Sequence, residues 1–350
     1  MTKQISIKEI ARLANVSAGT VDRVIHKRGN VSPKSLAAVE AVLSKLDYMH
    51  PTFAPPAKAY NIIVSIPTPV SGEYWGGIFD GIERAVQESK DVNIELKNCF
   101  FNQFDIYSCR SSYVNIEQST PDGVIIGSCF REETLALCAD LETRGIPYVF
   151  VDSYIEGTSP IASYTTNQFG CGRILGRIMH DLSPEEGSFA AFNAISIGNV
   201  ISYNSEERYI GLQAFFKELG QESRLLSTTF SVLDPGQNER TIPEFFRQHK
   251  DVKCIAVMNS RAYIIADIIH AVNDKVHILS FDATSNNIRC LENGSIAYLL
   301  CQRPNQQGFN AVRALVNKFL YDKVEPTFEE FIPVDIIIKE NLPFYKDLFV

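Results

Sequence analysis

Long apolar segments are missing from this chain of 350 residues, in which no run of 18 uncharged apolar residues occurs. That absence excludes transmembrane helices, and a hydrophobic share of 45% with 21% charged residues is typical of a globular chain with buried cores. The N-terminal residues also lack the apolar stretch that signal peptides carry. We therefore expect a cytoplasmic protein of two or three domains that has no contact with a membrane.

The motifs of metal sites and of common catalytic sites are missing as well. The eight cysteines include no C-x-x-C pair and several lie in apolar segments, which favours reduced core thiols over disulfides or a zinc site. No G-x-x-x-x-G-K-[ST], H-E-x-x-H or G-x-S-x-G motif occurs, and the six histidines form no pair with metal-ligand spacing. Gly170, Gly172 and Gly176 come within one residue of a dinucleotide fingerprint, but close helix packing is the favoured interpretation. We therefore expect no enzyme, no metal and no cofactor.

Charge is distributed unevenly along the chain. The net charge is -8, yet residues 1–60 hold nine lysine and arginine residues against four acidic ones. A small basic segment on an acidic body indicates a module that binds a polyanion, joined to a body with another task. A basic surface that arose by chance is the alternative that charge by itself leaves open.

Three short helices are expected in the basic segment. Ser6 and Glu9 form a capping box that predicts a helix from residue 7, with Ile7, Ile10, Leu13 and Ala14 on its inner face.

Ser17 has the position of a second cap, followed by a helix over residues 18–26. Ser32 and Pro33 begin a third helix, with Leu36 among its inward residues. Two short helices joined by about three residues form a helix-turn-helix, which inserts its second helix into the major groove of DNA.

The stretch IKEIARLANVSAGTVDRVIHKRGNVSPKSLAAVEAVLSKLDY resembles the DNA-binding head of the LacI/GalR family of repressors. The resemblance implies that Ala18 and Gly19 are the base-reading pair and that Arg23 is a further reader, whereas Asp22 replaces the usual serine. Double-stranded operator DNA is then the partner. The expected DNA-binding residues are Ser6, Ser17, Ala18, Gly19, Thr20, Asp22, Arg23, His26, Asn30 and Ser32.

The segment after the head departs from the family pattern, which has a short hinge helix with a leucine that wedges into the minor groove. Ala57 stands at the leucine position, and Pro55 and Pro56 interrupt a helix. Phe53 or Met49 as the apolar wedge and a simple extended linker both remain open.

From residue 61 onward, short β-rich runs alternate with amphipathic helical patterns. This alternation predicts an α/β fold with parallel sheets flanked by helices, and the number of strands suits two sheets. Ligands of such folds bind at the carboxyl ends of the strands. We therefore looked for aromatic and polar residues just after each predicted strand.

Seven residues at or near such positions have the chemistry of a carbohydrate site, because flat aromatic rings cover the C–H faces of a sugar and polar side chains match its hydroxyls. They are Tyr74, Trp75, Asp152, Arg208, Asn259, Asp282 and Gln302.

A purely structural interpretation of these residues has equal weight. Asp152 and Asp282 are then loop caps, Trp75 belongs to the core, and Arg208 pairs with Glu206 or Glu207.

The body is similar to the periplasmic-binding-protein-like domain of LacI/GalR regulators, and particularly to the ribose-binding type. The resemblance implies that Tyr74 and Trp75 sandwich a sugar and that the other five residues form its polar contacts. Ser153 and Ser260 replace an arginine and an aspartate that related proteins often have, so the ligand need not be ribose.

The resemblance also implies three domain segments and a regulatory mechanism. We expect a helix-turn-helix domain over residues 1–50, a linker over 51–60 and a two-lobed body over 61–340. The expected N-lobe comprises about residues 61–160 and 284–325, and the expected C-lobe comprises about residues 161–283 and 326–340.

A small carbohydrate bound between the lobes would control binding to a pseudo-palindromic operator, which a homodimer reads economically. The rival interpretation is a sugar-binding protein without a DNA regulatory role.

Overall fold

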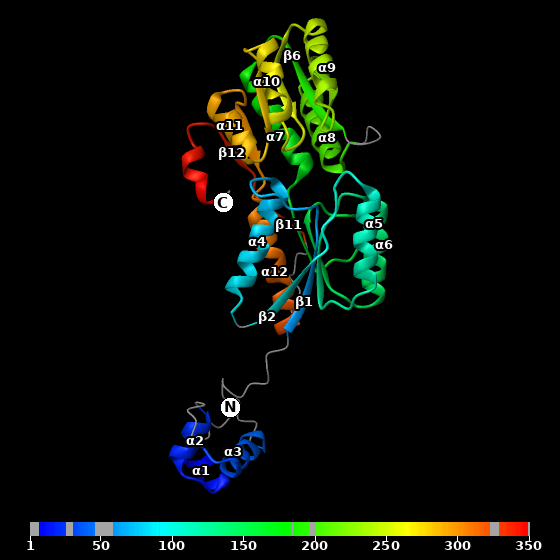
Figure 1. Cartoon of the computed structure of the whole chain (residues 1–350). Helices are drawn as coiled ribbons and strands as arrows, with labels where there is room; N and C mark the ends of the chain where they lie inside the picture. Colours follow the sequence, from blue (N-terminus) through cyan, green and yellow to red (C-terminus); the bar gives the residue numbers. More distant parts are fainter. Residues whose placement is uncertain are drawn as a thin grey trace. The chain divides into compact units, whose positions relative to one another are not determined.

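The chain consists of two units, residues 1–59 and residues 60–350 (Figure 1). The structure is a computed structural model. It describes residues 7–25, 31–45, 59–90, 92–183, 185–195, 201–322 and 329–348. Ser6, His26, Asn30 and the linker residues Met49 to Ala57 lie outside these ranges, so the predictions made for them are not tested.

The first unit contains the three expected helices, α1 (Ile7–Ala14), α2 (Ala18–Ile25) and α3 (Pro33–Lys45). Ser17 caps α2, since its Oγ accepts a hydrogen bond from the Thr20 backbone N–H at 3.1 Å. Ser32 does the same for Ser35 at the start of α3, at 3.2 Å. Asn15 makes the tight turn between α1 and α2 in the left-handed region, with φ of 54°.

The core of this unit is narrower than the sequence pattern predicts. Ile10 and Ala14 are buried as expected, but Ile7, Leu13 and Leu36 are 36%, 46% and 38% exposed. Three helices of 8 to 13 residues are too short to cover apolar positions beyond their crossing points. The core consists of Ile10, Ala11, Ala14, Val21, Val24, Val39 and Leu43.

Two six-stranded sheets form the second unit within the described residues. The first sheet has the order β11-β5-β4-β3-β1-β2, and the second has the order β12-β10-β9-β8-β6-β7. The strands of the first are β1 (Ala59–Ser65), β2 (Asn93–Asn98), β3 (Gly123–Gly127), β4 (Tyr148–Asp152), β5 (Ala162–Thr165) and β11 (Glu329–Phe331). Those of the second are β6 (Ser188–Ile195), β7 (Leu225–Ser231), β8 (Val252–Val257), β9 (His277–Phe281), β10 (Tyr298–Cys301) and β12 (Asp335–Ile337).

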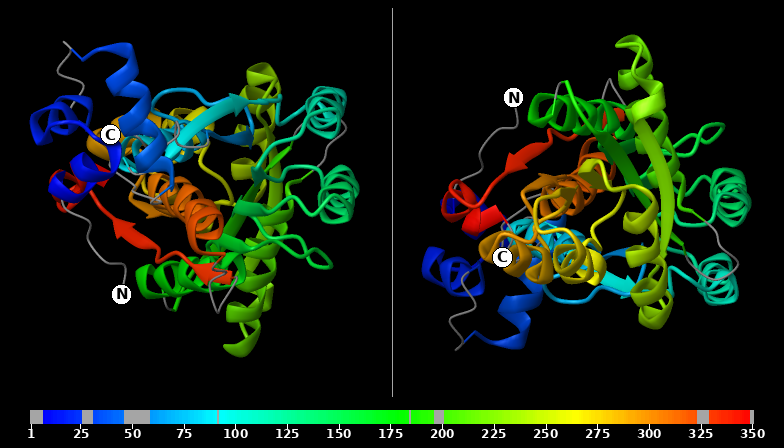
Figure 2. Two further views of the ribbon diagram at one scale, coloured as in Figure 1. Left: turned by 90° about the horizontal axis from the view of Figure 1, so that it is seen from below. Right: turned by 90° about the horizontal axis from the view of Figure 1, so that it is seen from above.

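Helices cover both faces of each sheet, as the α/β prediction requires (Figure 1). On the first sheet, α4 (Tyr74–Glu88) and α12 (Pro304–Tyr321) cover one face, and α5 (Ile106–Glu117) and α6 (Arg131–Thr143) cover the other. Figure 2 shows α5 and α6 side by side. On the second sheet, α7 (Gln168–Leu182) and α8 (Tyr203–Glu218) lie opposite α9 (Pro235–Gln248), α10 (Tyr263–Val272) and α11 (Ser285–Asn293).

The chain crosses between the two sheets later in the sequence than the approximate lobe boundaries predicted above. The chain leaves the first sheet after β5, returns after β10, and crosses again between β11 and β12. Residues 161–165 therefore belong to the N-lobe and residues 284–301 to the C-lobe. The physical reason is that β10 follows α11 in a β-α-β unit, so it pairs with β9 in the second sheet.

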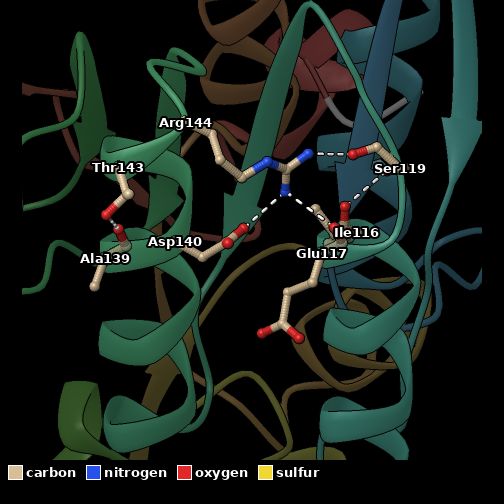
Figure 3. Close-up of polar contacts among 7 residues, drawn as sticks. All are labelled: Ile116, Glu117, Ser119, Ala139, Asp140, Thr143 and Arg144. Atoms are coloured by element: carbon tan, nitrogen blue, oxygen red, sulfur yellow. Dashed lines mark hydrogen bonds and ion pairs between the residues drawn. The ribbon is translucent and has the colours of Figure 1, made fainter.

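Arg144, just after α6, joins the C-terminal ends of α5 and α6 (Figure 3). Its Nη1 donates to the Asp140 carboxylate at 2.7 Å and to the Glu117 carbonyl at 3.2 Å, and its Nη2 donates to the Ser119 carbonyl. A cation at this place satisfies backbone acceptors that the end of α5 leaves open.

Glycines allow one helix pair in each lobe to touch backbone to backbone. A Cβ on Gly172 of α7 would lie less than 3.0 Å from the Arg208 carbonyl of α8, and a Cβ on Gly211 of α8 would meet the Phe169 carbonyl in the same way. Gly81 of α4 and Gly308 of α12 form the equivalent pair in the N-lobe. The predicted packing role of Gly172 is therefore confirmed.

Gly172→Ala should destabilise the body, because the added methyl group forces α7 away from α8. We expect a loss of about 2 kcal/mol or more, seen as a lower Tm in thermal unfolding followed by circular dichroism. Gly236→Ala in α9 is the matched control, since its Cβ has no neighbour closer than 3.4 Å. Equal Tm values for the two variants would refute the packing role.

Candidate functional site

A cavity of about 510 Å³ lies between the two lobes of the second unit, a size typical of small-molecule sites. All seven residues expected to bind ligand line it, namely Tyr74, Trp75, Asp152, Arg208, Asn259, Asp282 and Gln302. The first three come from the N-lobe, and the next three come from the C-lobe. Gln302 follows β10, where the chain passes between the lobes. Their role as ligand contacts remains a prediction.

Two buried aspartates lie at the carboxyl ends of strands, one in each sheet. Asp152 is the last residue of β4, and Asp282 directly follows β9. Both have left-handed backbone conformations, with φ of 70° and 57°. Such conformations are uncommon outside glycine and are found at functional sites, where the surrounding contacts hold them. Here they turn the carboxylates towards the cavity instead of continuing the strands.

Hydrogen bonds hold the Asp152 carboxylate from both lobes. The Tyr74 hydroxyl donates to Oδ1 at 2.8 Å, and the Asn204 side chain of α8 donates to Oδ2 at 3.0 Å. The second bond crosses the cleft. Among the residues that the structure describes, the buried Asn204 side-chain oxygen has no hydrogen-bond partner, so it is an acceptor at the cavity wall that could receive a hydrogen bond from a ligand hydroxyl.

Arg208 is committed to the protein and pairs with neither Glu206 nor Glu207. Its guanidinium donates to the Gln168 side chain at 2.7 Å, the Met258 carbonyl at 2.7 Å and the Gln302 side-chain oxygen at 2.9 Å. It also stacks on the Phe281 ring, 3.8 Å from the centroid. Arg208 therefore orients the cavity floor more than it offers free donors to a ligand.

Gln302 joins this arginine to the second aspartate. Its Nε2 donates to the Asp282 carboxylate at 2.9 Å, and its backbone N–H donates to the same carboxylate at 3.2 Å. Its side-chain oxygen also accepts from the Thr166 hydroxyl at 2.7 Å and from Gln168 at 3.2 Å. The floor of the cavity is thus one connected polar network.

Burial dominates the electrostatics of the floor. It raises the pKa of Asp282 to about 7, with a contribution from the nearby Asp152, while Arg208 and Gln302 oppose the rise. Burial also raises the pKa of Asp152, against the hydrogen bonds from Tyr74 and Asn204 and the charge of Arg208. The pKa of the Tyr74 hydroxyl is raised by burial and by both aspartates, so it stays a donor.

The expected sandwich of a sugar between Tyr74 and Trp75 does not fit the structure. Their rings touch edge to face, with centroids 5.5 Å apart and an interplanar angle of 80°, which leaves no room for a sugar ring between them. Trp75 is also part of the N-lobe core, as the structural interpretation holds. Phe104 and Tyr203 are further aromatic residues that line the cavity.

At the rim of the cavity the lobes touch each other. The Ser285 backbone N–H donates to the Gly72 carbonyl at 2.8 Å, and the Arg261 guanidinium lies 5.1 Å from the Phe104 ring centroid. Sequence reasoning missed these residues and Asn204, because they lie in loops or at helix starts, where no periodic pattern marks them.

In the first unit, three expected DNA-binding residues form an exposed surface on α2, two in its first turn and Arg23 in its last turn. Ala18, Gly19 and Arg23 are exposed. The Arg23 Nε donates to the Gly19 carbonyl at 3.1 Å, so the side chain lies along the helix and keeps its terminal N–H groups at the surface. The Ser17 and Thr20 hydroxyls are hydrogen-bonded at 2.9 Å.

Comparisons with known proteins agree with both units. Residues 6–51 match the bacterial regulatory proteins of the lacI family, and residues 62–320 match the periplasmic binding protein domain. The chain belongs to the lacI family of bacterial regulatory proteins. It is a DNA-binding transcriptional regulator, and such regulators are not enzymes.

Among its relatives, the regulator DegA of Bacillus subtilis is 23% identical over 292 residues, which cover 80% of this chain and 82% of DegA. The ribose operon repressor of Halalkalibacterium halodurans is 25% identical over 229 residues, which cover 65% of this chain and 62% of that protein. A solved structure assigned as a LacI transcriptional regulator from Bacteroides fragilis has a TM-score of 0.77 at 27% identity, covering 82% of this chain and 100% of that one.

Two further observations concern the described part of this LacI-family regulator. None of its helices has both the length and the apolar character needed to cross a membrane. Seven of the eight cysteines are buried as expected, whereas Cys129 is exposed and lines the cavity.

The pH dependence of stability tests the burial of Asp282. Its pKa of about 7 in the folded protein exceeds the ordinary value of 3.8, so this group favours folding fully below pH 4 and loses that contribution as the pH rises to 7. Three units of pKa correspond to about 4 kcal/mol.

The measurement is urea unfolding between pH 4 and 8, followed by the fluorescence of Trp75, the single tryptophan. Asp282→Asn is the comparison, because asparagine tolerates the left-handed backbone but does not titrate. We expect the free energy of unfolding of the wild type to fall relative to the variant by up to about 4 kcal/mol. A difference that is constant across this range would contradict the assignment.

Proposed function

We propose that this regulator is a homodimeric repressor that reads a pseudo-palindromic operator with the start of α2, and that a small carbohydrate bound between the lobes controls the reading. The observation that carries the proposal is the convergence of carboxylates, amides and aromatic rings from both lobes on one cavity. Two identical heads at a fixed spacing match a two-fold symmetric DNA site. The similarity to a ribose operon repressor supports a sugar as the class of effector.

The charges of the cavity favour an uncharged part of the ligand at the floor. A phosphate there would face Asp152 and Asp282, while the guanidinium of Arg208 is already hydrogen-bonded to protein acceptors. Hydroxyl groups, in contrast, donate well to carboxylates. The remaining cavity arginines, Arg131 and Arg261, are more exposed, so an anionic substituent would fit only at the mouth.

The rival proposal is a sugar-binding protein with no DNA role. It explains the cavity equally well, but it does not explain the three-helix first unit. The three helices α1 to α3, with side-chain caps at the starts of α2 and α3, and the exposed Arg23 favour the regulator. Operator binding by the intact chain decides between the two.

A ligand screen tests the effector class. At 100 times its dissociation constant, a ligand adds about 2.7 kcal/mol to stability. We expect at least one neutral mono- or disaccharide to raise the Tm of the purified protein, and we expect Asp282→Asn to lose much of that rise. A rise with phosphates alone, or with no carbohydrate, would overturn the proposed class.

Arg23→Ala tests the reading helix. The operator is first selected with the wild type from random duplex DNA. The Arg23→Ala protein should bind this operator about 1 to 3 kcal/mol more weakly than the wild type, because a bidentate contact to a guanine is removed. Sugar binding should be unaffected. Arg12→Ala is the matched control, since Arg12 of α1 is exposed and paired with Glu9. If both variants weaken the selected operator equally, Arg23 contributes charge only.

A further inference from the structure

Gln307 has no place in the cavity wall, yet its side chain contacts three parts of the site. It lies in the first turn of α12 and is fully buried. Its side-chain oxygen accepts a hydrogen bond from the Asp152 backbone N–H at 2.9 Å. Its Nε2 donates to the Tyr74 hydroxyl at 3.3 Å and to the Gln302 carbonyl at 3.0 Å.

Each of these contacts fixes a group on which the cavity depends. The bond to the Asp152 N–H holds the left-handed turn that aims the carboxylate. The bond to the Tyr74 hydroxyl occupies its acceptor side, so that its proton points to Asp152. The bond to the Gln302 carbonyl holds the place where the chain crosses between the lobes.

We propose that Gln307 is a positioning residue that couples the effector floor to the crossover between the lobes. The path runs from Asp152 through Gln307 to Gln302, and from there to Asp282 of the other lobe. A change in lobe position therefore changes the relative placement of the two carboxylates, and a ligand that bridges them favours one lobe position. This inference rests on the proposed function of the cavity.

Only a neutral amide meets the chemical demands of this position. Methionine has a similar volume but neither donates nor accepts well, so it leaves the buried Asp152 N–H without a partner. An ionised glutamate accepts from that N–H but cannot donate to Tyr74 or Gln302. A protonated glutamate accepts from the Asp152 N–H and donates a single hydrogen bond, to either Tyr74 or Gln302. The effect of Gln307→Glu should therefore depend on pH.

The first test needs no ligand. Hydrogen exchange of the full-length protein is compared between the wild type and Gln307→Met. We expect faster exchange, by about tenfold or more, in peptides that contain Asp152 and in those that contain Gln302 and Arg303, with no change in the helical amides around Leu315. Unchanged exchange at both places would overturn the proposal, whether or not any sugar binds.

The second test uses the sugar that gives the largest Tm rise in the screen. Gln307→Met should raise its Kd about tenfold or more and reduce the change in operator affinity that saturating sugar produces. For Gln307→Glu, the sugar Kd of the variant is divided by the sugar Kd of the wild type. This ratio should become smaller when the pH is lowered from 8 to 6, because the introduced carboxyl takes up a proton. The ratio cancels the part of the pH dependence that the two proteins share, and what is left comes from the introduced carboxyl and its effect on Asp152, Asp282 and Tyr74. A ratio that is independent of pH would contradict the donor role.

Asn238→Leu is the control for a merely structural loss. Asn238 is another fully buried amide, and within the described residues its side chain bonds to the backbone of Ser231 in the C-lobe. This variant should lower the Tm while leaving the sugar Kd and the exchange at Gln302 unchanged. If Gln307→Met behaves like it, Gln307 stabilises the fold and does not position the site. A screen without any sugar hit would refute the proposed function, but not the exchange result.

Discussion

The side chain of Gln302 is the contact on which the arrangement of the lobes depends. It accepts hydrogen bonds from Thr166, Gln168 and Arg208 and donates one to Asp282. Thr166 and Gln168 lie at the first crossing between the sheets, after β5, and Gln302 itself lies at the second, after β10. A third crossing is tied to it through the next residue, because Arg303 forms a bidentate ion pair with Asp335 at 2.6 and 2.8 Å. The polar network of the cavity floor is consequently connected directly to the segments where the chain crosses between the lobes.

Backbone strain occurs at the same place, where the cavity floor meets the crossings between the lobes. Asp152, Asp282 and Arg303 all have positive φ, and all lie within two residues of a strand end at the cleft. Each such conformation costs on the order of 1 kcal/mol for a residue with a side chain. The network of buried hydrogen bonds offsets that cost, and in return the carboxylates face the cavity at fixed angles. Removal of one member would leave several buried polar groups unsatisfied at once.

Local signals in the sequence were sufficient for the helices of the first unit and for seven of the residues that line the cavity. Ser17, Ser32 and Pro33 mark helix starts directly, whereas Asp152 ends a buried strand and Asp282 follows one. Because parallel strands end at one edge of a sheet, these positions predict proximity without any knowledge of contacts. The same reasoning cannot supply ring orientation, and so the arrangement of Tyr74 and Trp75 was predicted incorrectly.

Other features depend on tertiary pairing and were missed. The strand β5, with the sequence ASYT, is only four residues long and pairs with β4. The strands β11 and β12 have three residues each, which is too short for an alternating pattern to be recognised. Without them, the lobe boundaries could not be placed. Gln307 and Asn204 carry no local signal, since their importance arises from partners 155 and 52 residues away in the chain.

The glycine pairs show why motion between the lobes would concentrate at the crossings. In the N-lobe Gly81 and Gly308 bring α4 and α12 into backbone contact, and in the C-lobe Gly172 and Gly211 do the same for α7 and α8. Helices packed this closely cannot slide without a clash, so each lobe moves as a block. The α4–α12 pair carries Tyr74 at the start of one helix and Gln307 near the start of the other. The N-lobe therefore presents its part of the cavity floor on a rigid helix pair, and the segment around Gln302 and Arg303 is left to absorb the change in angle.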